Sequence, residues 1–110
     1  MRSVILSVFV IAAVSAGAVA AGQDEQTFTG TITDSECYDA DHSFMQMGPT
    51  DAECVEACII AHGAAYVLYD GETVYELSDQ QTPKQLAAQR VVVTGTLDPE
   101  TRMITVTAAR

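Results

Sequence analysis

The chain has 110 residues, with 15 acidic and 5 basic side chains and a formal net charge of −10 at pH 7. That length is enough for one domain with one modest core. No lysine or arginine occurs from Ser3 to Pro83, a stretch that carries most of the acidic residues. Such a surface repels phosphate backbones and anionic lipids, so nucleic-acid binding is disfavoured. A cation, a basic protein partner or simple solubility fits the charge better.

The first twenty residues predict a cleavable signal peptide. A basic head at Arg2 precedes an apolar run, Val4–Val14, and a small-residue exit follows at Ala18-Val19-Ala20. These are the three parts of a secretory signal. We therefore expect cleavage after Ala20 and an exported protein, periplasmic or secreted, with no stable membrane insertion afterwards. The alternative is an uncleaved anchor, since the run is about long enough to span a bilayer before it weakens into Ala, Gly and Ser.

Residues 21–26 are interpreted as a flexible polar lead-in, and residues 27–110 as a single domain. Strict alternation from Thr27 to Thr33 predicts a half-buried strand, with Phe28, Gly30 and Ile32 on one face. The periodicity then disappears from Asp34 to Pro49, which predicts a long loop. Loops of this length in compact domains are usually functional or disordered.

A helix is predicted over residues 51–62. Thr50 and Glu53 have the spacing of a capping box, and Gly63 supplies the stop. The expected apolar stripe of this helix consists of Ala52, Val55 and Ile59.

The rest of the domain is predicted to be strands and turns. Two short strands flank the hairpin dipeptide Asp70-Gly71. Thr82-Pro83 predicts an N-cap and a short helix to about Ala88. Two further strands follow, over residues 90–97 with a bulge or bend at Gly95, and over residues 102–107 with Ile104 and Val106 facing inward.

The predicted fold class is mainly β with one or two short helices. Without the segment 34–63, the element order is that of a five-stranded OB-like small barrel with a helix between its third and fourth strands. Closure would also bury the edges that an open sheet of this size exposes. The segment 34–63 is then a loop-helix insertion after the first strand.

All cysteines and histidines fall inside this insertion: Cys37, His42, Cys54, Cys58 and His62. Cys54 and Cys58 are one helical turn apart and share a face, so both could bind one metal ion. Cys37 and His42 from the loop would complete a closed set of three thiolates and one imidazole, of the structural-zinc kind. The sequence thus predicts a Cys3His metal site for zinc or copper, although the spacing matches no standard zinc-finger rule.

Three further residues are possible additional ligands: His62, Met45 and Met47. Thioethers beside thiolates suit cuprous copper, but methionines in a loop can also simply pack. His62 ends the helix, where an imidazolium is favoured without any ligand. Acidic residues surround the loop and could concentrate cations, although loop carboxylates are more often just solvated: Asp34, Glu36, Asp39 and Asp41.

A disulfide is the alternative, because exported proteins meet an oxidising environment. Cys37 could pair with Cys54 or with Cys58 and stabilise the domain by roughly 3 kcal/mol, which leaves one spare thiol. Cys54 and Cys58 are badly placed to pair with each other inside a helix. The protein would then be a disulfide-stapled OB-like interaction module. A thiol redox protein is a third reading. No enzyme class is indicated, because nothing fixes a base for a cysteine nucleophile.

Several segments resemble a family of small exported bacterial proteins of unknown function. They are the opening Thr29-Gly30-Thr31-Ile32-Thr33-Asp34-Ser35-Glu36-Cys37, then His42, then Cys54-x3-Cys58, then Ala65-Tyr66-Val67-Leu68, and the closing Val91-Val92-Val93-Thr94-Gly95-Thr96-Leu97. The resemblance covers about Phe28 to Val106 and implies export and a shared fold, but no activity. It matches Cys37, His42, Cys54 and Cys58, and not His62. A glycine often follows the first cysteine in that pattern, where this chain has Tyr38.

Overall fold

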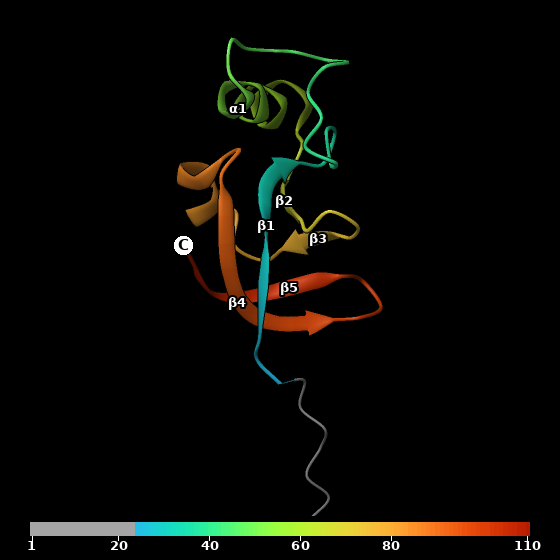
Figure 1. Cartoon of the computed structure of the whole chain (residues 1–110), viewed down its shortest axis with the longest axis vertical. Helices are drawn as coiled ribbons and strands as arrows, with labels where there is room; N and C mark the ends of the chain where they lie inside the picture. Colours follow the sequence, from blue (N-terminus) through green and yellow to red (C-terminus); the bar gives the residue numbers. More distant parts are fainter. Residues whose placement is uncertain (1–23) are drawn as a thin grey trace, which may run out of the picture.

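Strand β1 (Gln26–Asp34) is central to the fold, because it pairs with two other strands, one directly after the inserted helix and one near the end of the chain (Figure 1). The computed structural model describes residues 24–110. The other strands are β2 (Tyr66–Tyr69), β3 (Val74–Leu77), β4 (Arg90–Asp98) and β5 (Met103–Ala109). The helices are α1 (Asp51–His62) and a 3-10 helix, η1 (Thr82–Leu86).

The five strands form a closed barrel in the order β1-β2-β3-β5-β4. The pair β3 and β5 is parallel, and the other four pairs are antiparallel. Helix α1 lies between β1 and β2 in the chain and caps one end of the barrel, while η1 lies between β3 and β4 (Figure 1). The predicted OB-like barrel with a loop-helix insertion after its first strand is therefore confirmed.

The barrel interior is filled by aliphatic side chains from every strand, together with one from the helix. Ile32, Leu68, Val93 and Ile104 have at most 1% of their surface exposed, and Val55 from α1 joins them. Branched side chains suit this interior because they pack well on a pleated surface. Since Val55 belongs to the core, α1 is anchored to the mouth of the barrel.

Glycine at position 95 fits a narrow place between β4 and β5. The register between these strands shifts between Thr94 and Gly95, which confirms the expected bulge or bend. A Cβ atom at Gly95 would collide with the carbonyl oxygen of Thr105 and lie 2.7 Å from a methyl carbon of Ile104. No larger residue fits without movement of β5.

Two local predictions need correction. Ala52 is exposed, and the buried face of α1 consists of Cys54, Val55 and Cys58, with Ile59 half-buried. The buried face of the helix therefore carries two thiols beside Val55, in place of the expected Ala52.

The second correction concerns the short helix after Pro83. It is a 3-10 helix that ends at Leu86 and has Gln81, not Thr82, at its N-cap position. It stops early because Ala87 is extended and Ala88 has a left-handed backbone, so that the Ala88 N–H donates to the carbonyl of Ile32 in β1.

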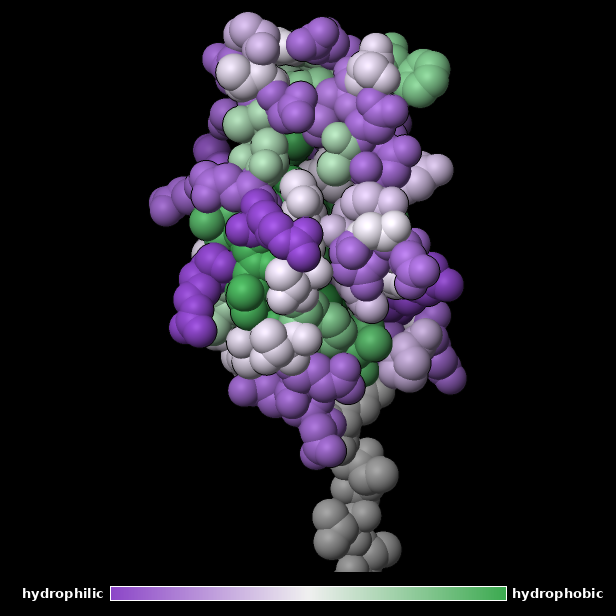
Figure 2. Space-filling model, viewed as in Figure 1, coloured by the Kyte–Doolittle hydropathy of each residue, from purple (hydrophilic) through white to green (hydrophobic). Residues whose placement is uncertain are grey.

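Hydrophilic side chains predominate on the face shown in Figure 2, and a patch of hydrophobic residues shows between them over the barrel. Residues 24–110 contain one ion pair, between Lys84 and Glu56 at 4.0 Å, and both side chains are exposed. Most of the acidic surface is thus left without a basic neighbour, as the composition indicates.

In residues 24–110 no helix combines the length and the apolar character needed to cross a bilayer. The predicted signal peptide, its cleavage point and the start of the lead-in lie outside the described residues, so export stays a prediction.

Candidate metal centre

The centre of the candidate site is a group of three side chains, Asp34, Cys37 and Cys58, whose ligand atoms all lie within 4.8 Å of one another. Asp34 is the last residue of β1, Cys37 lies in the turn that follows, and Cys58 is on the buried face of α1. Asp34 and Cys58 are fully buried, and Cys37 is 7% exposed. The site thus lies between the end of one strand and the inserted helix.

Local hydrogen bonds fold Cys37 back toward the end of β1. One carboxylate oxygen of Asp34, Oδ1, accepts from the backbone N–H groups of Glu36 and Cys37, both at 2.9 Å. The Thr33 hydroxyl donates to the carbonyl of Cys37 at 2.7 Å. Aspartate commonly stabilises tight turns by bonding to the N–H two residues on. This Asx-type turn places the Cys37 thiol beside the carboxylate.

The second carboxylate oxygen of Asp34, Oδ2, is buried and has no hydrogen-bond partner. Buried polar atoms in folded proteins are nearly always paired, and an unpaired charged one is costly. Here the orphaned oxygen belongs to a carboxylate that lies beside two thiols. A bound cation is the kind of partner that such an oxygen lacks.

Cys54 lies one turn before Cys58 and holds the loop against α1. Its thiol donates to the carbonyl of Met45 at 3.2 Å and accepts from the N–H of Met47 at 3.4 Å. It falls outside the group of mutually close ligand atoms, yet its proximity contributes to the raised pKa of both other thiols. Cys54 is thus a neighbour of the group, with a clear role in positioning the loop.

The thioether of Met47 is the sulfur contact nearest to solvent. The Cys58 thiol donates to the Met47 sulfur at 3.7 Å, and Met47 is 36% exposed. Two soft sulfur atoms are therefore in contact, and one of them belongs to a partly exposed residue.

Burial and negative charge keep the thiols protonated. Burial, followed by the charge of Asp34, raises the pKa of Cys58 to about 12 from an ordinary value of 9.0. The same two causes raise the pKa of Cys37, while hydrogen bonding to the Cys58 side chain acts in the opposite direction. A metal ion must therefore displace protons to bind here.

Comparison with known proteins finds no match. No protein-family model, no curated protein and no solved structure resembles the chain closely enough to indicate a family. The resemblance to small exported bacterial proteins therefore stays a prediction, and any function has to be argued from the site.

The structure brings some of the predicted ligands together and not others. Cys37 and Cys58 meet, whereas His42 is outside their group and His62 is exposed at the end of α1. Met45 contributes its carbonyl oxygen to the Cys54 thiol, while its side chain is 44% exposed. The Cys3His set stays a prediction. All three cysteines are free thiols, so neither predicted disulfide is present among the described residues.

Asp34 is the member of the group that sequence reasoning missed as a ligand. The sequence predicts a solvated loop residue here, but Asp34 ends β1 and is fully buried, with a carboxylate oxygen close to the thiol of Cys58 on α1. The spacing Asp34-x-x-Cys37 carries the clue, since an aspartate that bonds to the N–H groups two and three residues on must turn the chain back on itself.

Proposed function

We propose that the protein is a small exported metal-binding protein that takes up one zinc or copper ion and acts as a binder, buffer or carrier. One observation carries the proposal, the orphaned Asp34 oxygen beside the thiols of Cys37 and Cys58. Two thiolates and a carboxylate are ligands that zinc commonly takes. The ion would coordinate the unpaired oxygen of Asp34 and neutralise the negative charge of the buried thiolates. Export rests on the sequence alone.

The fourth ligand decides which metal the site prefers. Cys54, a member of the predicted Cys3His set, would complete a set suited to zinc. Met47 would add a thioether, which favours cuprous copper. The contact between Met47 and Cys58 at 3.7 Å supports the copper alternative. Met47→Leu keeps the size and removes the sulfur, so a selective loss of copper binding would identify this ligand.

Native mass spectrometry tests the proposal. The protein is purified from an exporting host without chelator, beside its Cys58→Ser variant. We expect the parent protein to bind a zinc or copper ion at this group and the Cys58→Ser variant to bind one ion fewer. His62→Ala is the matched control, because His62 is exposed and outside the group, so this variant should retain the ion. A parent protein without metal, two hydrogen masses below the reduced form, would overturn the proposal.

A disulfide-stapled interaction module is the second candidate. The observation in its favour is that the sulfur atoms of Cys37 and Cys58 already lie within 4.8 Å of each other. Oxidation would join them, leave Cys54 as the spare thiol, and direct the search for a protein partner to the barrel face. Thiol titration separates the two candidates, because the stapled form has one reactive thiol after unfolding and the metal form has three after chelation and unfolding.

A further inference from the structure

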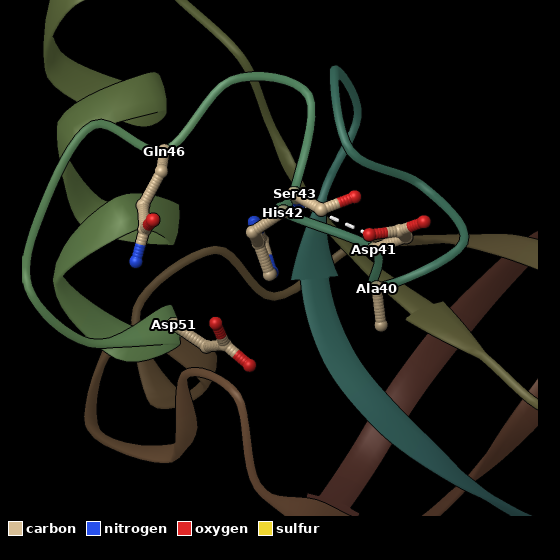
Figure 3. A pocket seen from close by; sticks show the side chains of 6 residues that line it. All are labelled: Ala40, Asp41, His42, Ser43, Gln46 and Asp51. Carbon is tan, nitrogen blue, oxygen red and sulfur yellow. Dashed lines mark hydrogen bonds between the residues drawn. The ribbon is translucent and has the colours of Figure 1, made fainter.

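A polar cavity lies between the loop and the start of α1. It has a volume of about 320 Å³ and is lined by Ala40, Asp41, His42, Ser43, Gln46 and Asp51 (Figure 3). No lysine or arginine lines it, and none of the three cysteines does. The cavity is therefore a separate place with its own donor atoms.

His42 supplies the observation that points to a ligand. Its side chain is only 5% exposed, and its ring nitrogen Nδ1 is buried without a hydrogen-bond partner. Figure 3 shows the ring between the side chains of Gln46 and Asp51, on the inner side of the loop. A buried imidazole that has no partner for one nitrogen calls for an explanation, such as an absent water or ion.

The two carboxylates of the cavity have different roles. Hydrogen bonding to the Ser43 side chain lowers the pKa of Asp41, followed by the bond that one Asp41 oxygen accepts from the Ser43 N–H at 3.0 Å, with a smaller contribution from His42. Figure 3 shows the Asp41 carboxylate on the Ser43 side of the loop, away from Asp51. Asp41 is thus held in a turn of the loop, which leaves Asp51 as the other carboxylate that lines the cavity.

We propose that this cavity is a second metal site, independent of the thiols, which takes a divalent transition ion of borderline softness such as Zn²⁺, Co²⁺ or Ni²⁺. Imidazole and carboxylate are ligands that suit such ions. His42 and Asp51 would bind the ion, and the amide oxygen of Gln46 and water would complete its coordination. An ion in this place pairs with the otherwise unpartnered ring. It also joins the loop to the start of α1.

Optical titration of the reduced, metal-free protein with Co²⁺ tests the proposal. Thiolate ligation gives charge-transfer bands in the near ultraviolet, whereas imidazole and carboxylate ligation does not. We expect two equivalents of Co²⁺ to bind, only one of which raises these bands. His42→Ala should lose the equivalent without charge transfer and keep the other. Asp51→Asn should weaken the same equivalent at least about tenfold, as the loss of a direct ligand requires.

Because His42 is buried, His42→Ala could lose metal through misfolding. Asp51 is exposed, so Asp51→Asn tests the same site without disturbing the fold. His62→Ala is the control and should retain both equivalents. A parent protein that binds no ion without charge transfer would overturn the proposal, and so would loss of the charge-transfer bands in His42→Ala, which would place His42 in the thiol site. If the parent protein binds the equivalent without charge transfer but shows no charge-transfer bands, the second site stands and only the proposed function, which rests on the thiols, is overturned.

Discussion

Among single residues, Asp34 has the largest effect on the two thiols of the group. Its charge raises the pKa of both Cys37 and Cys58, second only to burial in each case. The same charge would stabilise a bound cation. A single side chain therefore disfavours free thiolates and favours thiolates that are neutralised by metal.

Asp34→Asn separates these two effects. The amide oxygen can still accept from the Glu36 and Cys37 N–H groups, so the turn should persist. In the metal-free protein we expect the pKa of both thiols to fall, because the neighbouring charge is gone while burial remains. Metal affinity should decrease, because one ligand charge is lost. Thiolate absorbance against pH and competitive metal titration measure the two quantities.

Asp39→Asn is the matched control for this prediction. Asp39 is exposed and is a lesser contributor, after burial, Asp34 and Cys54, to the raised pKa of Cys37. Its loss should lower that pKa slightly and leave metal affinity nearly unchanged. Equal effects of the two substitutions would mean that Asp34 holds no ion.

The raised pKa values also predict how metal affinity depends on pH. Each thiol has to release its proton before it binds the ion, so affinity rises with pH as long as the pH is below the thiol pKa. With the pKa of Cys58 at about 12, this rise should continue through the whole neutral range. We expect roughly a tenfold gain per pH unit for each thiol ligand, measured by competition with a chelator of known affinity. Metal affinity that does not change with pH across the neutral range would contradict thiolate ligation.

Helix α1 positions two of the thiols, so its caps matter at the scale of elements. The Thr50 side chain accepts from the N–H of Glu53 at 3.2 Å and its hydroxyl donates to the Glu53 carboxylate at 2.9 Å. Gly63 ends the helix with a left-handed φ of 64°. The bond from the Glu53 N–H and the glycine stop are the ones that the capping pattern predicts, whereas the Glu53 carboxylate accepts from the Thr50 hydroxyl and not from its backbone N–H.

Thr50→Ala should lower the free energy of unfolding by about 1 kcal/mol, since it removes the N-cap acceptor. The first turn contains Glu53 and leads directly into Cys54, which holds the loop through its sulfur. Fraying there should also loosen the loop. Chemical denaturation measures the stability, and Thr50→Ser is the control that keeps the cap. Equal losses in both variants would show that the cap is not the cause.

The sequence predicts the elements well wherever the pattern is local. Alternation in β1, the caps of α1, the turn at Asp70-Gly71 and the bulge at Gly95 each depend on neighbouring residues, and all four are found. The rest depends on tertiary contacts. The early end of η1 depends on the bond from Ala88 to Ile32, a partner in another strand.

The candidate site was only partly predictable for the same reason. The helical spacing of Cys54 and Cys58 correctly predicts that they share a face. Which of them meets Cys37 depends on how α1 sits on the barrel, and the packing of Val55 into the core settles that. Burial of Asp34 likewise depends on a strand end that α1 covers, which no local pattern shows.

At the scale of the whole molecule, the barrel and the insertion should differ in stability. The barrel is closed by strand pairs all round, whereas the loop before α1 has mostly exposed side chains. Its attachment relies on a few contacts, among them the bonds between Ser35 and Ala65 at 2.9 and 3.0 Å and those of the Cys54 sulfur. Segments with few buried contacts open with low free energy.

Hydrogen exchange should therefore reveal two levels of protection. In the metal-free protein we expect the amides of residues 38–50 to exchange much faster than those of β1 and β4. Zinc should slow exchange in this loop and in α1, because an ion bound only to the folded form stabilises it by mass action. Central barrel amides should gain protection only to the extent that global stability rises.

In Cys58→Ser with the same zinc, the thiol site is lost and the ion in the cavity can protect only the loop between His42 and Asp51. Equal protection of the loop with and without zinc in the parent protein would mean that neither site holds an ion.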